Sequence, residues 1–302
     1  MANSDSYPGL SIIIVGMNVE GFLPPCLASV AALDYPREKI EVIYVDNASS
    51  DRSVECASRA PLPVRIVRND RNMGFSEGNN IGLRIAGGEY LVLLNADAEL
   101  HPEWAKEMLR CFRGDPRVGI AGCKIYYGRT TVLQHAGGFY DVLMRTGHYG
   151  IYEEDRGQYD EQREVGYVTA AAIMLSRKCL ETIGLFDRNY FIYGEETDWA
   201  IAATRAGFKV VYVPTAVAYH HEMSYTKGRT KKFYFLLARA RYRLLIKYFG
   251  LRGFFAAFRR DIVDRRAGLP EAQWPIRIVV KAFLWNIVRL PQTLMCRGRV
   301  FK

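Results

Sequence analysis

Three carboxylates within four positions form the densest group of proton-accepting side chains in the sequence. Glu195, Glu196 and Asp198 lie in the segment Y-G-E-E-T-D-W, where a helix is predicted to begin. Mutual repulsion and partial burial would raise the pKa of one of them toward a value useful in a general base. Alternatively, the three carboxylates only complement the helix dipole.

Two further polar segments follow predicted strands and could hold a metal. Asn95 and Asp97, in L-N-A-D-A-E, point to the same side of a strand end, and a hard divalent cation that also bridges phosphate oxygens prefers such ligands. Alternatively, Asp97 is merely a helix cap. His220 and His221 follow the last predicted strand, where a histidine is either a metal ligand or an ordinary polar strand end.

Nucleotide recognition is suggested by two more segments. Asp46 ends a strand in V-D-N-A-S-S-D-R-S, where it either accepts a hydrogen bond from a nucleobase or belongs to a simple strand-to-helix cap. The glycines and asparagines of residues 71–83 suit a ribose-phosphate contact at a helix start. The P-loop and G-x-G-x-x-G fingerprints are absent from the sequence, which argues against a NAD-dependent oxidoreductase.

Alternating strands and helices must position these side chains. β-Branched runs predict strands over Leu10–Val15, Glu41–Val45, Val64–Arg68, Tyr90–Leu94, Val118–Cys123, Ala170–Leu175 and Phe208–Val213, with a short apolar segment at Ala216–His220. Helical spacing predicts helices over Phe22–Leu33, Asp51–Arg59, Ser76–Ala86, Pro102–Phe112 and Glu196–Ala206. This order predicts an α/β fold with a mostly parallel sheet, whose ligands gather at the carboxyl ends of the strands.

Residues 124–164 interrupt the alternation with glycine, aromatic and acidic residues. Their length predicts a functional loop or lid. Its aromatic side chains could stack on sugar rings, although packing within the lid is the favoured interpretation for most of them: Tyr126, Tyr127, His135, Phe139, Tyr140 and Tyr149.

Composition and charge place the chain among ordinary globular proteins. The 302 residues are 49% hydrophobic and 24% charged, and six scattered cysteines form no C-x-x-C pair, so we expect reduced thiols. Residues 223–302 hold 19 basic and 3 acidic residues, a net charge of +16, whereas residues 1–222 hold 22 and 29, a net charge of −7. This asymmetry predicts a polyanionic partner for the C-terminal region.

Joined in order, these segments resemble a known enzyme family. V-D-N-A-S-S-D-R-S, N-M-G-F-S-E-G-N-N-I-G-L, L-N-A-D-A, Y-G-E-E-T-D and V-Y-V-P-T-A-V-A-Y-H-H are similar to the inverting family 2 glycosyltransferases of the GT-A fold, and most to their bacterial rhamnosyltransferase-like branch. The resemblance covers residues 10–248. It implies a catalytic domain over residues 1–222 and a basic, amphipathic helical region over residues 223–302.

The resemblance also implies roles for individual residues. Glu196 would be the catalytic base, and Asp97 and His220 would bind Mg²⁺ or Mn²⁺, with Glu195, Asp198 and His221 as secondary site residues. The donor-binding positions would be Asn18, Glu20, Asp46, Asn72, Gly74, Asn79, Asn95 and Ala96. Three departures from the family pattern are Asn95 for the first Asp of D-x-D, Glu196 for the more usual Asp, and H-H-E-M-S for H-x-G-G-S, which leaves His220 and His221 as alternative ligands.

The function implied is transfer of a sugar from a nucleotide diphosphate sugar to a hydroxyl of a glycan or lipid-linked acceptor. dTDP-rhamnose is the first donor candidate and UDP-sugars come next, because Asp46 could serve either pyrimidine. The alternative is a non-catalytic protein that binds nucleotide sugars or polyanions on the same fold.

The basic C-terminal region is predicted to meet a membrane. Arg241–Phe258 and Ile276–Leu290 mix basic and apolar residues at helical spacing, which suits helices lying in an anionic membrane interface. Alternatively, they pack on the catalytic domain or on a second subunit, as in a homodimer. No nucleic-acid-binding module accompanies the charge. Met1–Leu10 resembles no secretory signal, so a cytoplasmic protein, peripheral on the inner face of the cell membrane, is expected.

Overall fold

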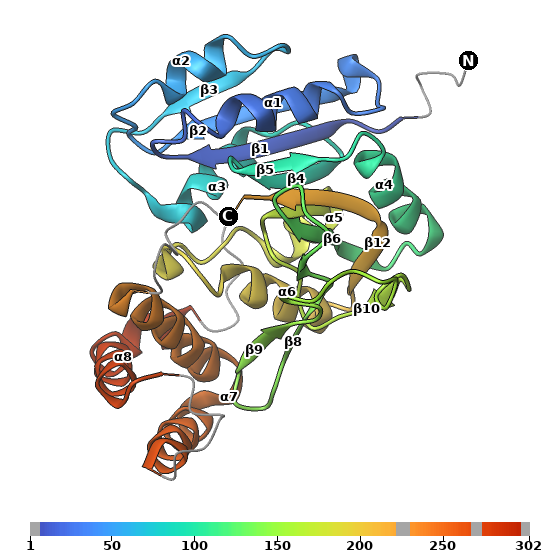
Figure 1. The fold of residues 1–302 in the computed structure, drawn as a ribbon. Helices are drawn as coiled ribbons and strands as arrows, with labels where there is room; N and C mark the ends of the chain where they lie inside the picture. The colour runs from blue at the N-terminus through green and yellow to red at the C-terminus, as the bar shows by residue number, and fades with distance from the viewer. Residues whose placement is uncertain (1–6, 222–229, 267–273, 297–302) are drawn as a thin grey trace.

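The computed structural model describes residues 7–221, 230–266 and 274–296, and a curved sheet lies at its centre (Figure 1). The order of its main strands is β10-β12-β6-β11-β4-β1-β2-β3, with β5 paired to β12 and β7 to β6. The strands are β1 (Leu10–Gly16), β2 (Ile40–Asp46), β3 (Arg65–Arg68), β4 (Tyr90–Asn95), β5 (Ala98–Leu100), β6 (Val118–Tyr127), β7 (Leu133–His135), β10 (Arg163–Glu164), β11 (Ala172–Ser176) and β12 (Lys209–His220).

The N-terminal half alternates strands and helices, as the sequence predicts. β1 pairs in parallel with β2 and β4, and β2 with β3. Along β1, Ile12 and Ile14 face one hydrophobic core while Ile13 faces the other, because successive side chains point to opposite faces. The helices that cover the sheet are α1 (Leu23–Ala31), α2 (Ser53–Ser58), α3 (Gly74–Ile85) and α4 (Trp104–Gly114).

Two features of the sheet differ from the prediction. β11 runs antiparallel between β4 and β6, so the sheet is mixed, although four of the seven pairs along its main strand order are parallel. β12 is one strand through Pro214, where a separate strand and apolar segment were predicted; its register against β6 shifts between Val213 and Val217. The strand tolerates proline there because that position lies in the irregular stretch of the ladder.

The predicted lid is more ordered than its composition suggests. It includes the end of β6, β7, a hairpin of β8 (Gly138–Tyr140) and β9 (Thr146–His148), and β10. After β11 come α5 (Arg177–Ile183), the 3-10 helix η3 (Arg188–Tyr190) and α6 (Glu195–Arg205). The loop that contains η3 therefore joins α5 to α6, the helix that carries the acidic segment.

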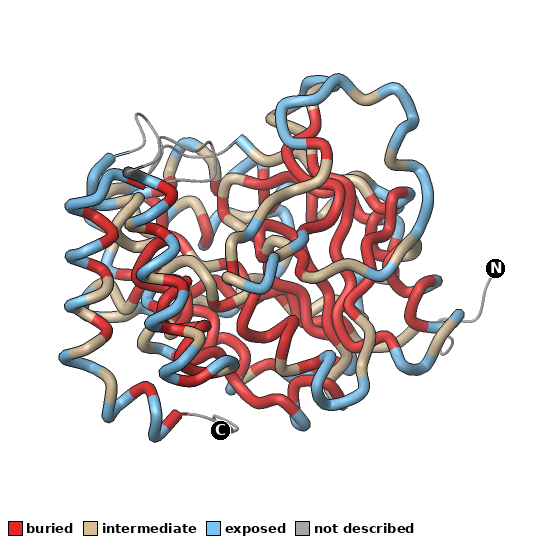
Figure 2. The backbone as a smooth tube through the Cα atoms, turned by 90° about the horizontal axis from the view of Figure 1, so that it is seen from below, coloured by how far each residue is buried: buried red, intermediate tan, exposed pale blue. Residues whose placement is uncertain are grey.

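The C-terminal region is helical, as predicted, and packs on the rest of the chain. α7 (Lys231–Arg266) bends at Gly250, whose φ is 69°, and α8 (Ile276–Val288) and α9 (Leu290–Met295) follow. Met144, Tyr190 and Ile201 join residues of α7 and α8 in a third hydrophobic core. Figure 2 shows buried residues concentrated in the sheet, with buried and exposed residues alternating along the C-terminal helices.

Two sequence predictions concern segments that lie wholly or partly outside the described residues. The predicted boundary between residues 222 and 223 lies outside the described residues, as do residues 1–6 of the N-terminal segment. Within the described ranges, no helix has both the length and the apolar composition needed to cross a bilayer.

Candidate active site

Asp97, His220 and Asn95 meet where β4 and β12 end. β5 pairs antiparallel with the end of β12, so that Ala98 lies opposite His220. His220 Nε2 lies 3.1 Å from Asp97 Oδ1 and 3.2 Å from Asn95 Nδ2. Its Nδ1 lies 2.7 Å from Gln134 Oε1, so in the tautomer that donates from Nδ1 the lone pair of Nε2 is directed at Asp97.

This arrangement fits a divalent cation. The Nε2 lone pair and a carboxylate oxygen face one another, and adjacent ligands of an octahedral ion with bonds of about 2.1 Å lie about 3.0 Å apart. Among the described residues, no group of three or more His, Cys, Asp or Glu side chains could hold a metal. Asp97 and His220 would therefore supply part of the coordination shell, with phosphate oxygens and water for the rest.

His221 faces a different partner. Its Nε2 lies 2.7 Å from Glu99 Oε1, and Glu99 also pairs with Arg129. Although burial opposes it, the bonds from His221 and Arg129 hold the pKa of Glu99 below its ordinary value. Of the two histidines, the geometry thus brings His220 to Asp97 and ties His221 to a separate ion-pair cluster.

The predicted nucleotide side is a buried turn stabilised by its neighbours. Asp46 is buried and accepts a bond of 3.1 Å from the Ser49 backbone N–H. Asn18 accepts from the Ser50 N–H at 2.8 Å. Glu20 accepts from the backbone and side chain of Arg52. The structure brings Asn18, Glu20 and Asp46 together around one turn, with Asn18 and Glu20 hydrogen-bonded to it.

Asn47, a residue of this turn that the sequence analysis did not name among the site residues, joins the turn to the glycine loop of residues 71–83. Its Nδ2 donates to the Gly74 carbonyl at 3.0 Å, and its Oδ1 accepts from Asn69 Nδ2 at 2.8 Å. Asn47 lies beside Asp46 in the quoted motif, so its position in the strand-to-helix turn was the available signal.

The glycine loop bends sharply at Gly74 and is hydrogen-bonded to Phe191, which is distant in the sequence. Gly74 has a φ of 79°, and its N–H donates to Asn72 Oδ1 at 2.8 Å. The Phe191 carbonyl accepts from the next amide, that of Phe75, at 2.6 Å. Asn79 is buried and bonds to the backbone of its own helix, and Ala96 is also buried.

Glu195 and Glu196 open α6 after Gly194, whose φ is 89°. Burial, together with the neighbouring Glu196 charge, raises the pKa of Glu195 well above its usual range. Burial also raises the pKa of Glu196, while the amides of Glu196 and Gly194 act in the opposite direction. Neither carboxylate is an ordinary solvated acid, which suits the proposed use of one as a base.

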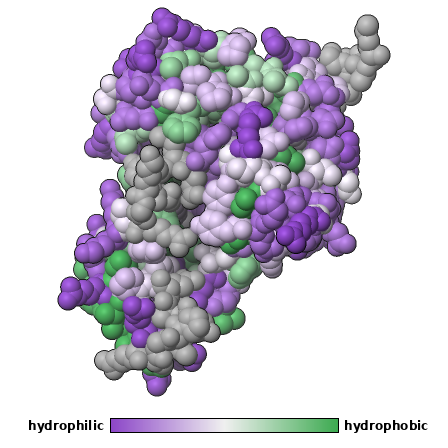
Figure 3. Space-filling view, in the orientation of Figure 1, coloured by the Kyte–Doolittle hydropathy of each residue, from purple (hydrophilic) through white to green (hydrophobic). Residues whose placement is uncertain are grey.

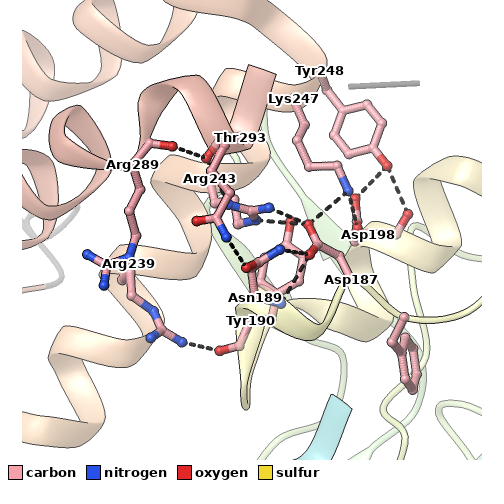
Figure 4. Close-up of polar contacts among 12 residues, drawn as sticks. Asp187, Asn189, Tyr190, Asp198, Arg239, Arg243, Lys247, Tyr248, Arg289 and Thr293 are labelled. Atoms are coloured by element: carbon pink, nitrogen blue, oxygen red, sulfur yellow. Dashed lines mark hydrogen bonds and ion pairs between the residues drawn. The ribbon is translucent and has the colours of Figure 1, made fainter. Parts of the chain in front are cut away.

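Asp198 does not join this pair, contrary to the predicted group of three. It is buried and ion-paired with Lys247, and its Oδ1 accepts from Tyr248 at 2.6 Å (Figure 4). Asp198 lies two positions after Glu196 and so points to another side of α6, and its carboxylate is held by Lys247 and Tyr248 although it lies three positions after Glu195. Asp187 pairs with Arg243 at 2.6 Å in the same cluster.

The lid aromatics mostly contact one another or nearby polar groups. Tyr127 stacks on Tyr152 with ring centroids 5.3 Å apart, and Phe139 contacts Tyr149 at 4.9 Å. His135 is buried, with its Nδ1 lying 2.7 Å from His148 Nδ1. Tyr126 donates to Asp155, and Tyr140 packs against both neighbouring cores. These contacts agree with the favoured interpretation that most of them pack the lid.

Comparison with known proteins adds a family and named relatives. The model of the family described as "Glycosyl transferase family 2" matches residues 11–184. The N-acetylglucosaminyl-diphospho-decaprenol L-rhamnosyltransferase of Mycobacterium tuberculosis is 26% identical over 71% of this chain and 75% of its own length. The O-antigen biosynthesis protein RfbC of Myxococcus xanthus is 28% identical over 71% of this chain and 17% of its own length.

A Sinorhizobium fredii protein, y4gI, is 30% identical over 60% of this chain and 21% of its own length. The chain thus spans about a fifth of the length of y4gI and RfbC.

Solved structures share the fold at low sequence identity. GalNAc-T7 with UDP, GalNAc and Mn²⁺ superposes with a TM-score of 0.65 at 17% identity, over 97% of this chain and 58% of the other. The mannosyltransferase PcManGT of Pyrobaculum calidifontis, with GDP-Man and Mn²⁺, gives a TM-score of 0.60 at 16% identity, over 97% of this chain and 85% of the other.

Proposed function

Because the chain belongs to glycosyl transferase family 2 and has the GT-A fold, we propose that it transfers a sugar from a nucleotide diphosphate sugar to an acceptor hydroxyl with inversion at the anomeric carbon. The observation that carries this proposal is the pairing of Asp97 with His220 at one strand-end site, in a chain that also has the buried Glu195 beside the half-buried Glu196 at the start of α6. The acceptor would be a glycan or a lipid-linked sugar.

Asp97 and His220 are the proposed metal ligands. Mg²⁺ or Mn²⁺ held there would neutralise the negative charge of the leaving diphosphate. Gln134 fixes the ring of His220 by accepting from Nδ1, and this leaves Nε2 directed at Asp97. The similar structures that contain Mn²⁺ support the choice of a divalent cation.

Glu196 is the proposed general base. Its carboxylate takes the proton of the acceptor hydroxyl while the acceptor oxygen forms a bond to the anomeric carbon. The bond from that carbon to the diphosphate breaks on the opposite face. Burial raises the pKa of Glu196, which makes it a better proton acceptor than a solvated carboxylate once it is ionised.

The donor nucleotide is proposed to lie over the turn that includes Asp46, with Asn18, Glu20, Asn72, Gly74, Asn95 and Ala96 around it. The structure gives Asn79 a hydrogen bond within its own helix, which makes it a supporting residue of that helix. The Mycobacterium relative is named a rhamnosyltransferase, which supports dTDP-rhamnose as the first donor to test and UDP-sugars as the next.

The C-terminal helices carry an exposed apolar stripe that fits a membrane surface. Ile276, Val280, Leu284 and Val288 recur every four residues on α8 and are 37% to 77% exposed. Arg277 and Lys281 lie one position further along the same helix and are also exposed. Figure 3 shows apolar side chains on the surface over the C-terminal helices. We propose anionic lipid as the partner of this stripe.

The first half of the predicted membrane segment Arg241–Phe258 needs a correction. Arg241, Arg243 and Lys247 are buried: Arg241 pairs with Asp261 of the same helix, whereas Arg243 and Lys247 pair with Asp187 and Asp198 of the acidic body. They are therefore not available to lipid.

Flotation with anionic liposomes tests the lipid proposal. The wild type and V142E, which changes an exposed residue of the β8–β9 turn, should bind, whereas L284E/V288E should not. Equal binding by these three proteins would reject the lipid proposal. Homodimer formation and a cytoplasmic location stay predictions.

The experiment that tests the proposed function is a donor panel. Full-length protein is incubated with dTDP-rhamnose, UDP-sugars and GDP-mannose in the presence of Mn²⁺ or EDTA, and nucleoside diphosphate release is measured. Metal-dependent release from one pyrimidine donor, with an inverted anomeric product by NMR, is the expected result. Tight binding of a nucleotide sugar without release or transfer would favour the non-catalytic alternative.

A further inference from the structure

One face of α7 is directed at the loop that leads into the proposed base. Arg239, Arg243 and Lys247 are spaced four residues apart, so they lie along a single side of the helix. Figure 4 shows their side chains pointing at the segment that contains Asp187, Tyr190 and Asp198.

Each of the three basic side chains holds a different point of this segment. Arg239 donates to the Tyr190 carbonyl. The guanidinium of Arg243 donates twice to Asp187 Oδ2, at 3.0 and 2.6 Å. Lys247 pairs with Asp198 and lies 3.7 Å from Asp187.

These contacts are almost completely shielded from water. Asp187 and Arg243 are each 1% exposed, Asp198 is 5% exposed and Lys247 is 7% exposed. A buried ion pair adds little net stability over apolar residues of the same size, because both charges lose their hydration. It does fix the orientation of the two paired segments relative to each other, since removing either partner leaves an uncompensated charge.

The segment that these ion pairs orient includes Glu196. Asp187 lies before the start of α6, and Asp198 lies two positions after Glu196. Gly194, the residue before α6, packs so tightly on α7 that a Cβ there would lie 2.9 Å from the Cβ of Ala240. α7 therefore contacts the chain on both sides of the Glu196 carboxylate.

We propose that Arg239, Arg243 and Lys247 are positioning residues that hold the start of α6, and with it Glu196, in the orientation needed for proton removal from the acceptor. This rests on the proposed role of Glu196 as base. The basic C-terminal region is then a working part of the catalytic unit in addition to any surface role that it has.

The test uses a charge-neutral pair of substitutions, K247M/D198N. It removes one positive and one negative charge together, so neither partner is left buried and unpaired. We expect the affinity for UDP or dTDP to stay within about twofold of the wild type and kcat to fall at least about tenfold, because a small displacement of a reacting group carries such a cost.

A pH profile separates positioning from simple stability. The amides of Gly194 and Glu196 lower the pKa of the Glu196 carboxylate, so a displaced helix start should weaken these bonds and raise that pKa. The acid limb of the kcat profile should then move to higher pH in K247M/D198N and return toward the wild-type position in K247R. K232M, which replaces an exposed lysine on the same helix, is the matched control and should behave as wild type.

Wild-type kcat and acid limb in folded K247M/D198N would overturn the proposal. R239K provides a second test, because it keeps the positive charge that acts on Glu195 and removes the guanidinium that donates to the Tyr190 carbonyl. If the double variant does not fold, a wild-type profile for R239K overturns the proposal, and a shifted one supports it. Failure of the proposed function would be distinct, because the wild-type protein would then transfer no sugar, and failure of the proposed base would leave Glu196→Gln fully active.

Discussion

The proposed donor side and the proposed base side of the site are stabilised in different ways. On the donor side, hydrogen bonds join the turns that follow neighbouring strands: Asp46 bonds to Ser49, Asn72 to Gly74 and, across 32 residues, Asn18 to Ser50. On the base side, Asp187 pairs with Arg243, 56 residues away. Strand ends and the turns that follow them therefore build the first region, whereas a separate helix, α7, holds the second. Substitutions in α7 should therefore change the proposed reaction without contacting the substrate.

The same comparison explains the charge asymmetry of the sequence. The basic C-terminal region faces the acidic body through Arg243 and Lys247, so part of its charge is neutralised inside the protein. A second cluster, in which Arg145 of the lid pairs with Asp261 and Asp264 of α7, ties the β8–β9 turn to the same helix. The predicted lid and the loop before α6 thus share one support.

The largest effect on stability is expected from Lys247→Met compared with Arg52→Met. Lys247 is buried and its loss leaves Asp198 uncompensated, which costs about 3–5 kcal/mol of unfolding free energy. The Arg52–Glu20 pair is exposed and screened by solvent, so its loss should leave the free energy of unfolding almost unchanged. Urea unfolding of both variants measures the difference, and equal destabilisation would remove the contrast between the two regions.

The next effect is on turnover, through Asp97→Asn. Loss of the carboxylate charge at the proposed metal site should lower the transfer rate on the order of 100-fold, because metal-assisted charge stabilisation contributes several kcal/mol. Glu99→Gln is the matched control, since Glu99 bonds to His221 and Arg129 and not to His220. Initial rates across a Mn²⁺ titration check this, and similar rates for the two variants would count against Asp97 as a ligand.

A smaller effect is expected from Gly74→Ala in the glycine loop. The φ of 79° costs a non-glycine residue about 1–2 kcal/mol, and the new Cβ would lie 2.5 Å from the Phe191 ring. The KM for the donor should rise, because the loop must move. Gly21→Ala, whose Cβ would meet nothing within 4 Å, should leave both stability and KM unchanged in the same assays.

The smallest effect is confined to acid pH. Although burial opposes it, the charges of Arg243 and Lys247 hold the pKa of Asp187 below its ordinary value. This pairing stabilises the fold above about pH 4 and is lost as the pH falls through the lowered pKa. The charge-neutral variant R243M/D187N should therefore show a shallower loss of stability below about pH 4. Thermal melting across pH 2–7 measures it, and parallel curves would contradict the assignment.

The sequence was most informative where function lies at strand ends. Asn95, Asp97 and His220 each follow or end an apolar run, and the structure brings these three together, whereas Asp46 bonds within its own turn. The predicted helix start at Glu196 was also right to within one residue.

The base-side support could not be predicted in this way. Basic and aromatic residues at helical spacing give the same pattern whether the helix packs on lipid or on an acidic body, and periodicity does not identify what covers a face. Asp187 and Asp198 likewise have no local signal, because their partners come from a helix about 50 residues further along the chain.

The measurement that tests the central claim most directly is turnover by Glu196→Gln, with Glu181→Gln on the exposed face of α5 as the control. Without a proton acceptor at this position, kcat should fall about 10²–10⁴-fold while UDP or dTDP binds with unchanged affinity. Glu181→Gln should transfer sugar at the wild-type rate. Near-normal transfer by folded Glu196→Gln would contradict the assignment of Glu196 as the base.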